Sequence, residues 1–204
     1  LLIPMKQAGI EVKPIITLGG AHSVNMVHLT DVKVPVENRV GEEGKAWTYA
    51  KGLLAHERTG LAGISRSLVA LEKLRKQAGS VTRGNGSLLD DPSYRLKVAE
   101  LEVELMATEF TELRSLASAA AGAEPGPESS ILKLKGTEIQ QRLQKLTVEA
   151  GGIYSAAWGA TPVGHTFAHG GMSGYLASRA YTIYGGASEV QRDVIAKNVL
   201  GLKK

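Results

Sequence analysis

Apolar residues in the first 43 positions form short runs that are typical of β-strands. The runs fall at residues 10–16, 24–29 and 32–36, and Gly19-Gly20 and Pro35 interrupt them. Glycine and proline mark places where extended segments turn or stop. We therefore predict three or four strands in this part, too few to form a sheet without unpaired edges.

From Lys45 onward the apolar residues recur with the period of an α-helix. Leu61, Ile64, Leu68 and Leu71 follow one another at spacings that place them on one helical face. A long helix is therefore predicted from Lys45 to a polar loop at residues 79–87.

A second long helix is predicted to begin at Asp91-Pro92. A carboxylate cap followed by proline at the first helical position is a typical helix start. Its inward face is expected to carry Val98, Leu101, Leu105 and Thr108. The Gly- and Pro-containing segment 121–127 ends it.

A third long helix is predicted to end at Gly151-Gly152. Its apolar stripe comprises Ile139, Leu143, Leu146 and Ala150. A Gly-rich loop at 159–174, a helix through Ala180 and a last helix from about Ser188 to Leu200 complete the chain.

These patterns predict a mostly α protein. Three long amphipathic helices and a shorter, broken pair each need a partner for their apolar stripes. An antiparallel up-and-down helical bundle preceded by a partial β segment satisfies that need.

Composition excludes several classes of function. Hydrophobic residues make up 43% and charged residues 22% of the 204 positions, as in ordinary globular proteins. The net charge of +4 lacks a dense Lys/Arg block, so no nucleic-acid partner is expected. The chain has no cysteine, which fits a cytoplasmic location. No apolar run approaches the roughly 20 residues that span a bilayer.

Several motifs occur in the order found in acyl-CoA dehydrogenases. Residues 29–38 read LTDVKVPVEN, residues 40–47 read VGEEGKAW, residues 53–58 read LLAHER, and residues 181–192 read YTIYGGASEVQR. Each motif is weak alone, but together they make the chain resemble that family over essentially its whole length. The resemblance implies the C-terminal part of the middle β domain at residues 1–43 and the C-terminal helical bundle domain at 44–204. An upstream portion is expected, because the chain starts inside a strand-like run.

The resemblance implies an FAD-dependent oxidoreductase that converts an acyl-CoA thioester to the trans-2-enoyl-CoA. A carboxylate removes the α-proton while the β-hydrogen leaves as hydride to the flavin. Electron-transfer flavoprotein is the implied electron acceptor, and a homodimer or homotetramer is the implied assembly. The alternative is a flavin-free, non-catalytic partner subunit of a hetero-oligomeric acyl-CoA dehydrogenase. The isolated 204-residue chain is expected to be inactive.

Glu57 is the expected catalytic base. Many relatives carry a catalytic Glu at the position that is Gly185 here. Other relatives place the base on the first bundle helix, directly before an arginine, and this chain has Glu57-Arg58 there. Arg58 would then orient the base. The competing interpretation makes the two residues a solvated glutamate and a surface cation.

The glycine turn before the last helix is an expected contact for the cofactor. Gly186, Ser188 and Glu189 match flavin-contacting positions of the family, and a helix start also suits anionic ligands. Most relatives have threonine where this chain has Ala187. Tyr184 and Gly185 are expected beside the substrate thioester, although Tyr184 would fit a core equally well.

Two further cofactor contacts are expected from the resemblance. Gly151 and Gly152 match a Gly-Gly pair at a flavin-contacting helix end. The family's Arg-x-x-Phe-Gly loop, whose arginine reaches the flavin of a neighbouring subunit, is replaced here by VTRGNGS at residues 81–87. Arg83 either substitutes for that arginine or is an ordinary loop cation.

Other polar and aromatic residues carry less specific signals. His165 and His169 are spaced like ligands but lie in a Gly-rich loop without a carboxylate, so no metal is expected. Trp47 and Trp158 are expected to be core anchors. The apolar stripes of residues 139–150 and of the last helix are expected to exceed the needs of one bundle and to drive oligomerisation.

Overall fold

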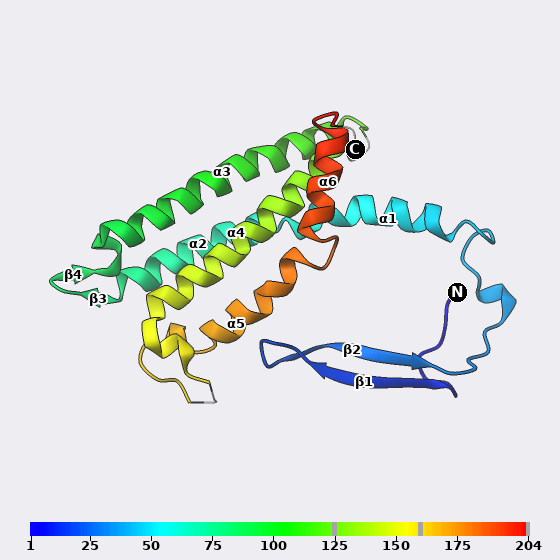
Figure 1. The fold of residues 1–204 in the computed structure, drawn as a ribbon, viewed down its shortest axis with the longest axis horizontal. Helices are drawn as coiled ribbons and strands as arrows, with labels where there is room; N and C mark the ends of the chain where they lie inside the picture. The colour runs from blue at the N-terminus through cyan, green and yellow to red at the C-terminus, as the bar shows by residue number, and fades with distance from the viewer. Residues whose placement is uncertain (124–125, 159–160, 203–204) are drawn as a thin grey trace. The chain divides into compact units, whose positions relative to one another are not determined.

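The computed structural model describes residues 1–123, 126–158 and 161–202, with the side chains of residues 54–61 outside that description. The chain forms two compact units, residues 1–53 and residues 54–204 (Figure 1). The first unit contains the β-hairpin and the second contains most of the helices, so we describe each by itself.

The first unit is built on one antiparallel hairpin. Strand β1 (Ile10–Ile16) pairs with β2 (His22–Leu29), from Ile10 opposite Leu29 to Ile16 opposite His22. The predicted turn at Gly19-Gly20 joins them, and the N–H of Gly20 donates to the carbonyl of Thr17 over 2.8 Å. Gly20 has a φ of 81°, which only glycine adopts readily.

The third apolar run does not form a strand, so the prediction of three or four strands in this segment was wrong. Pro35 precedes a short 3₁₀ helix, η1 (Val36–Asn38), instead. Proline cannot donate to a ladder. Asn38 pairs with Leu2, by a backbone hydrogen bond of 2.8 Å and a side-chain bond of 3.0 Å. This pairing draws the segment to the chain's first residues rather than to the hairpin.

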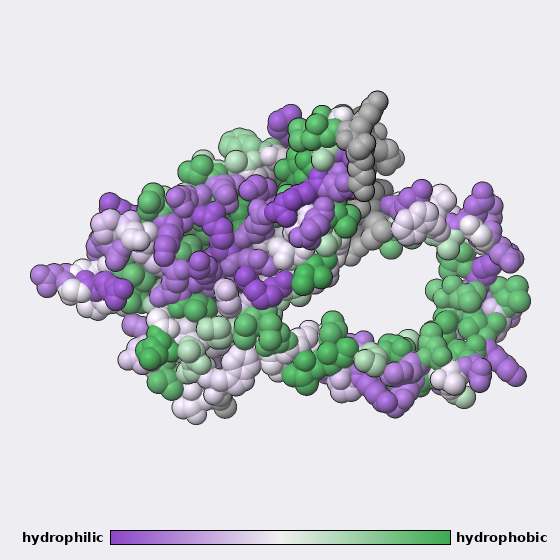
Figure 2. All heavy atoms as spheres, in the orientation of Figure 1, coloured by the Kyte–Doolittle hydropathy of each residue, from purple (hydrophilic) through white to green (hydrophobic). Residues whose placement is uncertain are grey.

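The hairpin leaves its apolar side chains uncovered. Figure 2 shows hydrophobic surface along this unit. The exposed residues on both faces include Val12, Ile16, Val24, Met26, Val27 and Leu29. A two-stranded hairpin is marginal by itself, so these faces need a further apolar surface to cover them.

The first predicted long helix is two helices. Helix α1 (Ala46–Leu61) ends before Gly63, and α2 (Ile64–Gly79) begins after it. Gly63 has φ 60° and ψ 36°, a left-handed conformation that stops the first helix. The single continuous helix was therefore a wrong prediction, although Ile64 and Leu71 are buried as expected.

A short hairpin and a well-capped helix follow α2. Strands β3 (Thr82–Arg83) and β4 (Gly86–Ser87) form the hairpin, and η2 (Leu88–Asp90) follows. Asp91 accepts hydrogen bonds from the N–H groups of Ser93 and Tyr94, at 2.9 and 3.1 Å. Helix α3 (Pro92–Ala120) therefore begins where the sequence predicts.

Helix α4 (Glu128–Gly151) is the centre of the second unit. It packs against α2, α3, α5 (Gly171–Ala177) and α6 (Ser188–Asn198). Three short 3₁₀ segments, η3 (Gly152–Ala156), η4 (Thr166–Ala168) and η5 (Ser178–Thr182), complete the unit. The predicted stripe of α4 and the predicted inward face of α3 both lie in the core.

Ion pairs cover the face where α3, α4 and α6 meet. Arg142 binds Glu104 at 2.7 Å, Lys97 binds Glu149 at 2.8 Å, and Arg192 binds Glu138 at 2.8 Å. Figure 2 shows this face as hydrophilic. Such partly exposed pairs each contribute little stability, so the apolar core holds the helices together.

The apolar surface available for assembly is only partly where the sequence placed it, since Val190 on α6 and Val199 and Leu200 just after α6 are exposed but the stripe on α4 is not. Ile139, Leu143 and Leu146 are buried inside the chain, so the stripe of residues 139–150 is fully used within one bundle. A further exposed stripe runs along α3, with the seven-residue spacing of a coiled-coil seam. It comprises Leu96, Val103, Met106, Phe110 and Leu113, each at least half exposed.

The tryptophans also differ from expectation. Trp47 is 68% exposed and Trp158 is 60% exposed, so neither anchors a core within this chain. Over the described ranges, no helix combines the length and apolar character that crossing a membrane requires.

Candidate functional site

The turn between η5 and α6 is built from two glycines in left-handed conformations. Gly185 has a φ of 64° and Gly186 a φ of 92°. Side chains with a Cβ rarely adopt such angles. The sequence Gly-Gly is therefore required by the backbone path that leads into α6.

A buried lysine holds this turn from α4. The Lys133 ammonium donates to the carbonyl of Gly186 at 2.7 Å and to the carbonyl of Tyr181 at 3.1 Å. Lys133 is completely buried. Burial lowers the pKa of Lys133, and the charge of Glu189 opposes that shift.

Gln191 packs against the other side of the turn. It is also completely buried, and its Nε2 would lie 2.2 Å from a Cβ added at Gly186. Neither atom of its amide has a hydrogen-bond partner among the described residues. Gly186 is thus restricted both by its φ and by the space that Gln191 occupies.

The N-terminal end of α6 carries polar groups without side-chain partners among the described residues. Ala187 is the N-cap residue and provides no side-chain hydrogen bond to the first amides of the helix. Ser188 is 5% exposed, and its Oγ is without a partner in the described part of the chain. Uncapped amides and a spare hydroxyl at the positive end of a helix suit a polar or anionic group. These residues therefore fit the flavin contact predicted for Gly186, Ser188 and Glu189.

Two tyrosines and an arginine lie beside the turn. The rings of Tyr181 and Tyr184 meet edge to face, with centroids 5.8 Å apart. The pKa of Tyr184 is raised by burial and by Tyr181, while the positive charge of Arg66 opposes the rise. Tyr184 is nevertheless 49% exposed, so in this chain it is a surface residue and not part of the core.

A small cavity of about 200 Å³ opens between α2 and α4 beside these residues. Arg66, Gln140, Gln144 and Tyr181 provide its polar lining. The Nε2 of Gln140 donates to the carbonyl of Ala62 over 2.9 Å, across the break between α1 and α2. The cavity thus combines a cation, amides and a phenol at one edge of the candidate site.

Gly151 and Gly152 serve the end of α4. A Cβ at Gly151 would lie 2.1 Å from the Oγ of Ser155 and 2.7 Å from the Cβ of Ala168, so close packing requires glycine there. Gly152 is the C-cap of α4, with a φ of 56°. Both glycines are explained by the local fold, and their contact with a flavin stays a prediction.

Arg83 lies on the β3–β4 hairpin and is exposed. In Figure 1 this hairpin and the Gly151-Gly152 end of α4 lie at the opposite end of the helical unit from α6. The predicted cofactor residues therefore do not form one cluster within a single chain.

Glu57 and Arg58 fall within α1, but their side chains belong to the stretch 54–61 outside the described residues. Their roles as base and orienting residue remain predictions.

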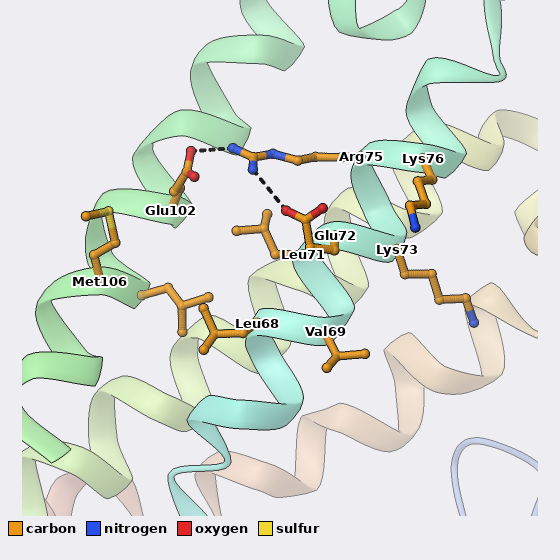
Figure 3. Close-up of a pocket in the computed structure, with 10 residues that line it drawn as sticks. Leu68, Val69, Leu71, Glu72, Lys73, Arg75, Lys76, Glu102 and Met106 are labelled. Carbon is orange, nitrogen blue, oxygen red and sulfur yellow. Dashed lines mark hydrogen bonds and ion pairs between the residues drawn. The ribbon is translucent and has the colours of Figure 1, made fainter. Parts of the chain in front are cut away.

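A larger groove, of about 510 Å³, lies between α2 and α3 and contains none of the predicted site residues (Figure 3). Leu68, Leu71 and Met106 provide apolar walls. Arg75 of α2 joins the two helices by binding Glu102 of α3, and it also pairs with Glu72 on its own helix at 3.2 Å. The groove adjoins the exposed α3 stripe, since Met106 belongs to both.

Sequence reasoning missed Lys133 and Gln191. No spacing signals them, because the lysine's partners lie 48 and 53 residues further along the chain. The only available sign was a lysine flanked by Leu132 and Leu134 near the inward face of a helix. As for metals, the described residues contain no group of three or more potential ligands.

Comparisons with known proteins establish the class of protein. Residues 44–200 match the model of the family "Acyl-CoA dehydrogenase, C-terminal domain", and the chain belongs to that family. Among relatives, the acyl-CoA dehydrogenase IpdE1 of Mycolicibacterium smegmatis is 30% identical over 100% of this chain and 49% of its own length.

Solved structures agree with that assignment. The steroid ACAD Tcur3481-Tcur3483 matches 99% of this chain and 51% of its own, with 27% identity and a TM-score of 0.85. The ChsE4-ChsE5 complex from Mycobacterium tuberculosis matches 99% of this chain and 52% of its own, with 27% identity and a TM-score of 0.82. The chain thus spans about half the length of the relatives it matches.

Proposed function

We propose that this chain forms the C-terminal part of an FAD-dependent acyl-CoA dehydrogenase. One observation carries the proposal. In a chain of this family, two left-handed glycines lead into a helix whose first amides and buried Ser188 hydroxyl lack side-chain partners in the described structure. Such an end is ready to bind a polar ligand.

The cofactor would be held from several sides. Gly186, Ser188 and Glu189 would bind it at the α6 end, while Arg83, Gly151 and Gly152 would contribute from the far end of another chain. FAD would supply the hydride acceptor. The 204-residue chain alone presents only one wall of such a site, so it should hold FAD weakly and turn over no acyl-CoA.

Glu57 would remove the α-proton of the substrate. Gly185 provides no carboxylate at the turn, and Glu57-Arg58 lies on the first bundle helix, where other relatives place the base. Tyr184, which is half exposed beside Gly185, would flank the thioester. An apolar, closed site would raise the pKa of Glu57 and so favour its action as a base.

Assembly would occur through helical surfaces. The exposed seam of α3 offers a continuous apolar stripe, and adjacent apolar walls line the α2–α3 groove. Burial of such a stripe against a second copy would favour a homodimer or homotetramer. Electron-transfer flavoprotein is proposed as the electron acceptor, and a cytoplasmic location stays a prediction.

A hetero-oligomeric role is the second candidate. Two structures similar to this chain are named as pairs of proteins, ChsE4-ChsE5 and Tcur3481-Tcur3483. The altered Arg83 loop and Ala187 fit a subunit that shares a flavin site with a different chain. In its extreme form, this candidate is a flavin-free, non-catalytic partner.

The deciding experiment is purification of the full-length protein, followed by flavin spectroscopy and anaerobic addition of acyl-CoA thioesters. A yellow protein whose flavin is bleached by an acyl-CoA supports the dehydrogenase. A colourless protein that gains neither flavin nor activity when FAD is added contradicts it and favours the non-catalytic subunit.

A further inference from the structure

Lys133 is the largest fully buried side chain in the described part of the protein. Burying an ammonium is costly unless hydrogen bonds satisfy it. Salt bridges found among the described residues do not include Lys133, and its two hydrogen-bond acceptors are both backbone carbonyls. The ammonium is therefore satisfied only while the backbone at Tyr181 and Gly186 keeps its observed position.

One of the two carbonyls, that of Tyr181, precedes the glycine turn, and the other, that of Gly186, belongs to the turn. Tyr181 belongs to η5, whose carbonyl end attracts positive charge. Gly186 lies directly before the N-cap of α6. One ammonium thus holds the end of η5 and the start of α6 at a fixed separation.

The turn has few backbone hydrogen bonds of its own. Before it, the N–H groups of Ile183 and Tyr184 both donate to the carbonyl of Ala180, at 2.9 and 3.0 Å. After it, the N–H of Gln191 donates to the carbonyl of Ala187 at 3.0 Å. Outside regular helices, the described backbone makes no hydrogen bond that spans Gly185 and Gly186 between these points. Lys133 provides this link, because it donates hydrogen bonds to the carbonyls of both Tyr181 and Gly186.

Gln191 closes the opposite side. Its amide packs against Gly186, so the turn lies between two fully buried side chains. Two consecutive glycines would otherwise give this segment unusual freedom, because glycine populates many backbone conformations.

We propose that Lys133 is a positioning residue that fixes the Gly185-Gly186 turn and thereby aims the N-terminal amides of α6 at their ligand. The inference rests on the proposed function for the identity of that ligand, a flavin or the acyl thioester beside it. Its structural part, the immobilisation of residues 182–191 by Lys133, is independent of any activity.

The test compares Lys133→Met, Lys133→Arg and Lys133→Gln with a matched control in the full-length protein. Lys135→Met removes a lysine two positions away on the same helix, where the side chain is 44% exposed and pairs with Glu104 and Glu138. Amide hydrogen exchange is measured along the whole chain, together with FAD affinity and the separate effects on kcat and KM.

We expect Lys133→Met to raise exchange over residues 182–191 on the order of tenfold, while the amides of α3 keep their protection. Lys133→Arg retains a cationic donor and should restore part of the protection. Flavin affinity and kcat should fall in Lys133→Met and recover partly in Lys133→Arg. Lys135→Met should change none of these quantities.

If residues 182–191 of Lys133→Met exchange their amide hydrogens at the same rate as in the wild type, the inference is overturned. A uniform rise of the exchange rate along the whole chain would overturn it as well. If Lys133→Met does not fold, Lys133→Gln, which keeps a neutral donor, takes its place. Failure of both to fold would show that Lys133 supports the whole bundle rather than the turn, which also overturns it. A wild-type protein without flavin would contradict the proposed function but leave the exchange result intact.

Discussion

The hydroxyl of Tyr94 donates a hydrogen bond of 2.9 Å to the backbone carbonyl of Leu146, which joins α3 to α4 inside the core. Tyr94 is 5% exposed and stands in the first turn of α3, directly after the Asp91 cap. The bond therefore connects the well-defined start of one long helix to the last third of the central helix.

Tyr94→Phe should lower the free energy of unfolding by about 1 kcal/mol, since it removes one buried hydrogen bond and leaves the ring in place. Denaturant unfolding of the full-length protein measures this change. The hydroxyl-bearing residue Tyr154, which is 43% exposed, offers a matched control. If Tyr154→Phe lowers the free energy of unfolding as much as Tyr94→Phe does, the hydrogen bond between Tyr94 and Leu146 does not stabilise the folded protein.

The same bond predicts a pH dependence. Burial, with a smaller contribution from the charge of Glu149, raises the pKa of Tyr94 above its ordinary value of 10.0. The folded protein then holds this proton more tightly than the unfolded chain. The neutral phenol of Tyr94 makes its full contribution to the free energy of unfolding below pH 10. That contribution is lost as the pH rises through the pKa that Tyr94 has in the folded protein.

We therefore expect the stability difference between wild type and Tyr94→Phe to shrink above about pH 10. Unfolding curves of both proteins at matched pH values measure it, and the comparison cancels the titration of lysines. A difference that stays constant as the pH rises would contradict the assigned pKa direction.

Gly136 on α4 lies against the break between α1 and α2. A Cβ there would meet the carbonyl oxygen of Ala62 at 2.3 Å and its Cα at 2.6 Å. Gly136→Ala should therefore destabilise the protein by about 1–3 kcal/mol, although alanine favours helices. Gly52→Ala in α1 is the control, because its Cβ would meet no described atom within 4 Å.

Gly52→Ala should be neutral or stabilising by up to about 1 kcal/mol. Thermal unfolding of the two variants distinguishes packing from propensity. Stabilisation by both substitutions would show that α4 does not approach Ala62 as closely as described.

Local signals in the sequence predicted much of the fold. Asp91-Pro92 located the start of α3 because capping depends on neighbouring residues alone. The spacing of Ile139, Leu143 and Leu146 identified the buried face of α4 because a helix has a fixed period. The helical bundle followed from such signals, whereas the family was identified from the resemblance of motifs such as residues 53–58 and 181–192.

Long-range packing explains the failures. The apolar period runs through the break at Gly63 without interruption, and the break packs against Gly136 and Gln140 of α4, over 70 positions away. Pro35 and the pairing of Asn38 with Leu2 removed an expected strand. Whether an apolar stripe stays exposed depends on how every neighbouring helix packs. Periodicity within one helix therefore could not show that the exposed stripe lies on α3 rather than on α4.

The exposed seam of α3 should mediate assembly. Phe110→Glu places a charge within the stripe, where Phe110 is 63% exposed. We expect the dissociation constant of the oligomer to rise roughly tenfold or more, so that it dissociates at correspondingly higher protein concentrations. Ala119→Glu adds the same charge on α3 away from the seam and should leave assembly unchanged.

Light scattering and sedimentation over a range of concentrations measure both variants. A wild-type protein that is monomeric at micromolar concentration would contradict assembly itself. An oligomer that Phe110→Glu leaves intact would place the interface elsewhere.

The account depends most on the identity of the catalytic base. Glu57→Gln in the full-length protein keeps the size and polarity of the side chain but removes the carboxylate that would abstract the α-proton. Glu43→Gln, whose side chain is 90% exposed beside Arg39, is the matched control. The measurement is the rate of anaerobic flavin bleaching by an acyl-CoA thioester, with bound FAD quantified from the same spectra. We predict that Glu57→Gln retains FAD and loses about 100-fold or more of the bleaching rate, while Glu43→Gln bleaches like wild type. Near-normal bleaching in Glu57→Gln would contradict the assignment of the base.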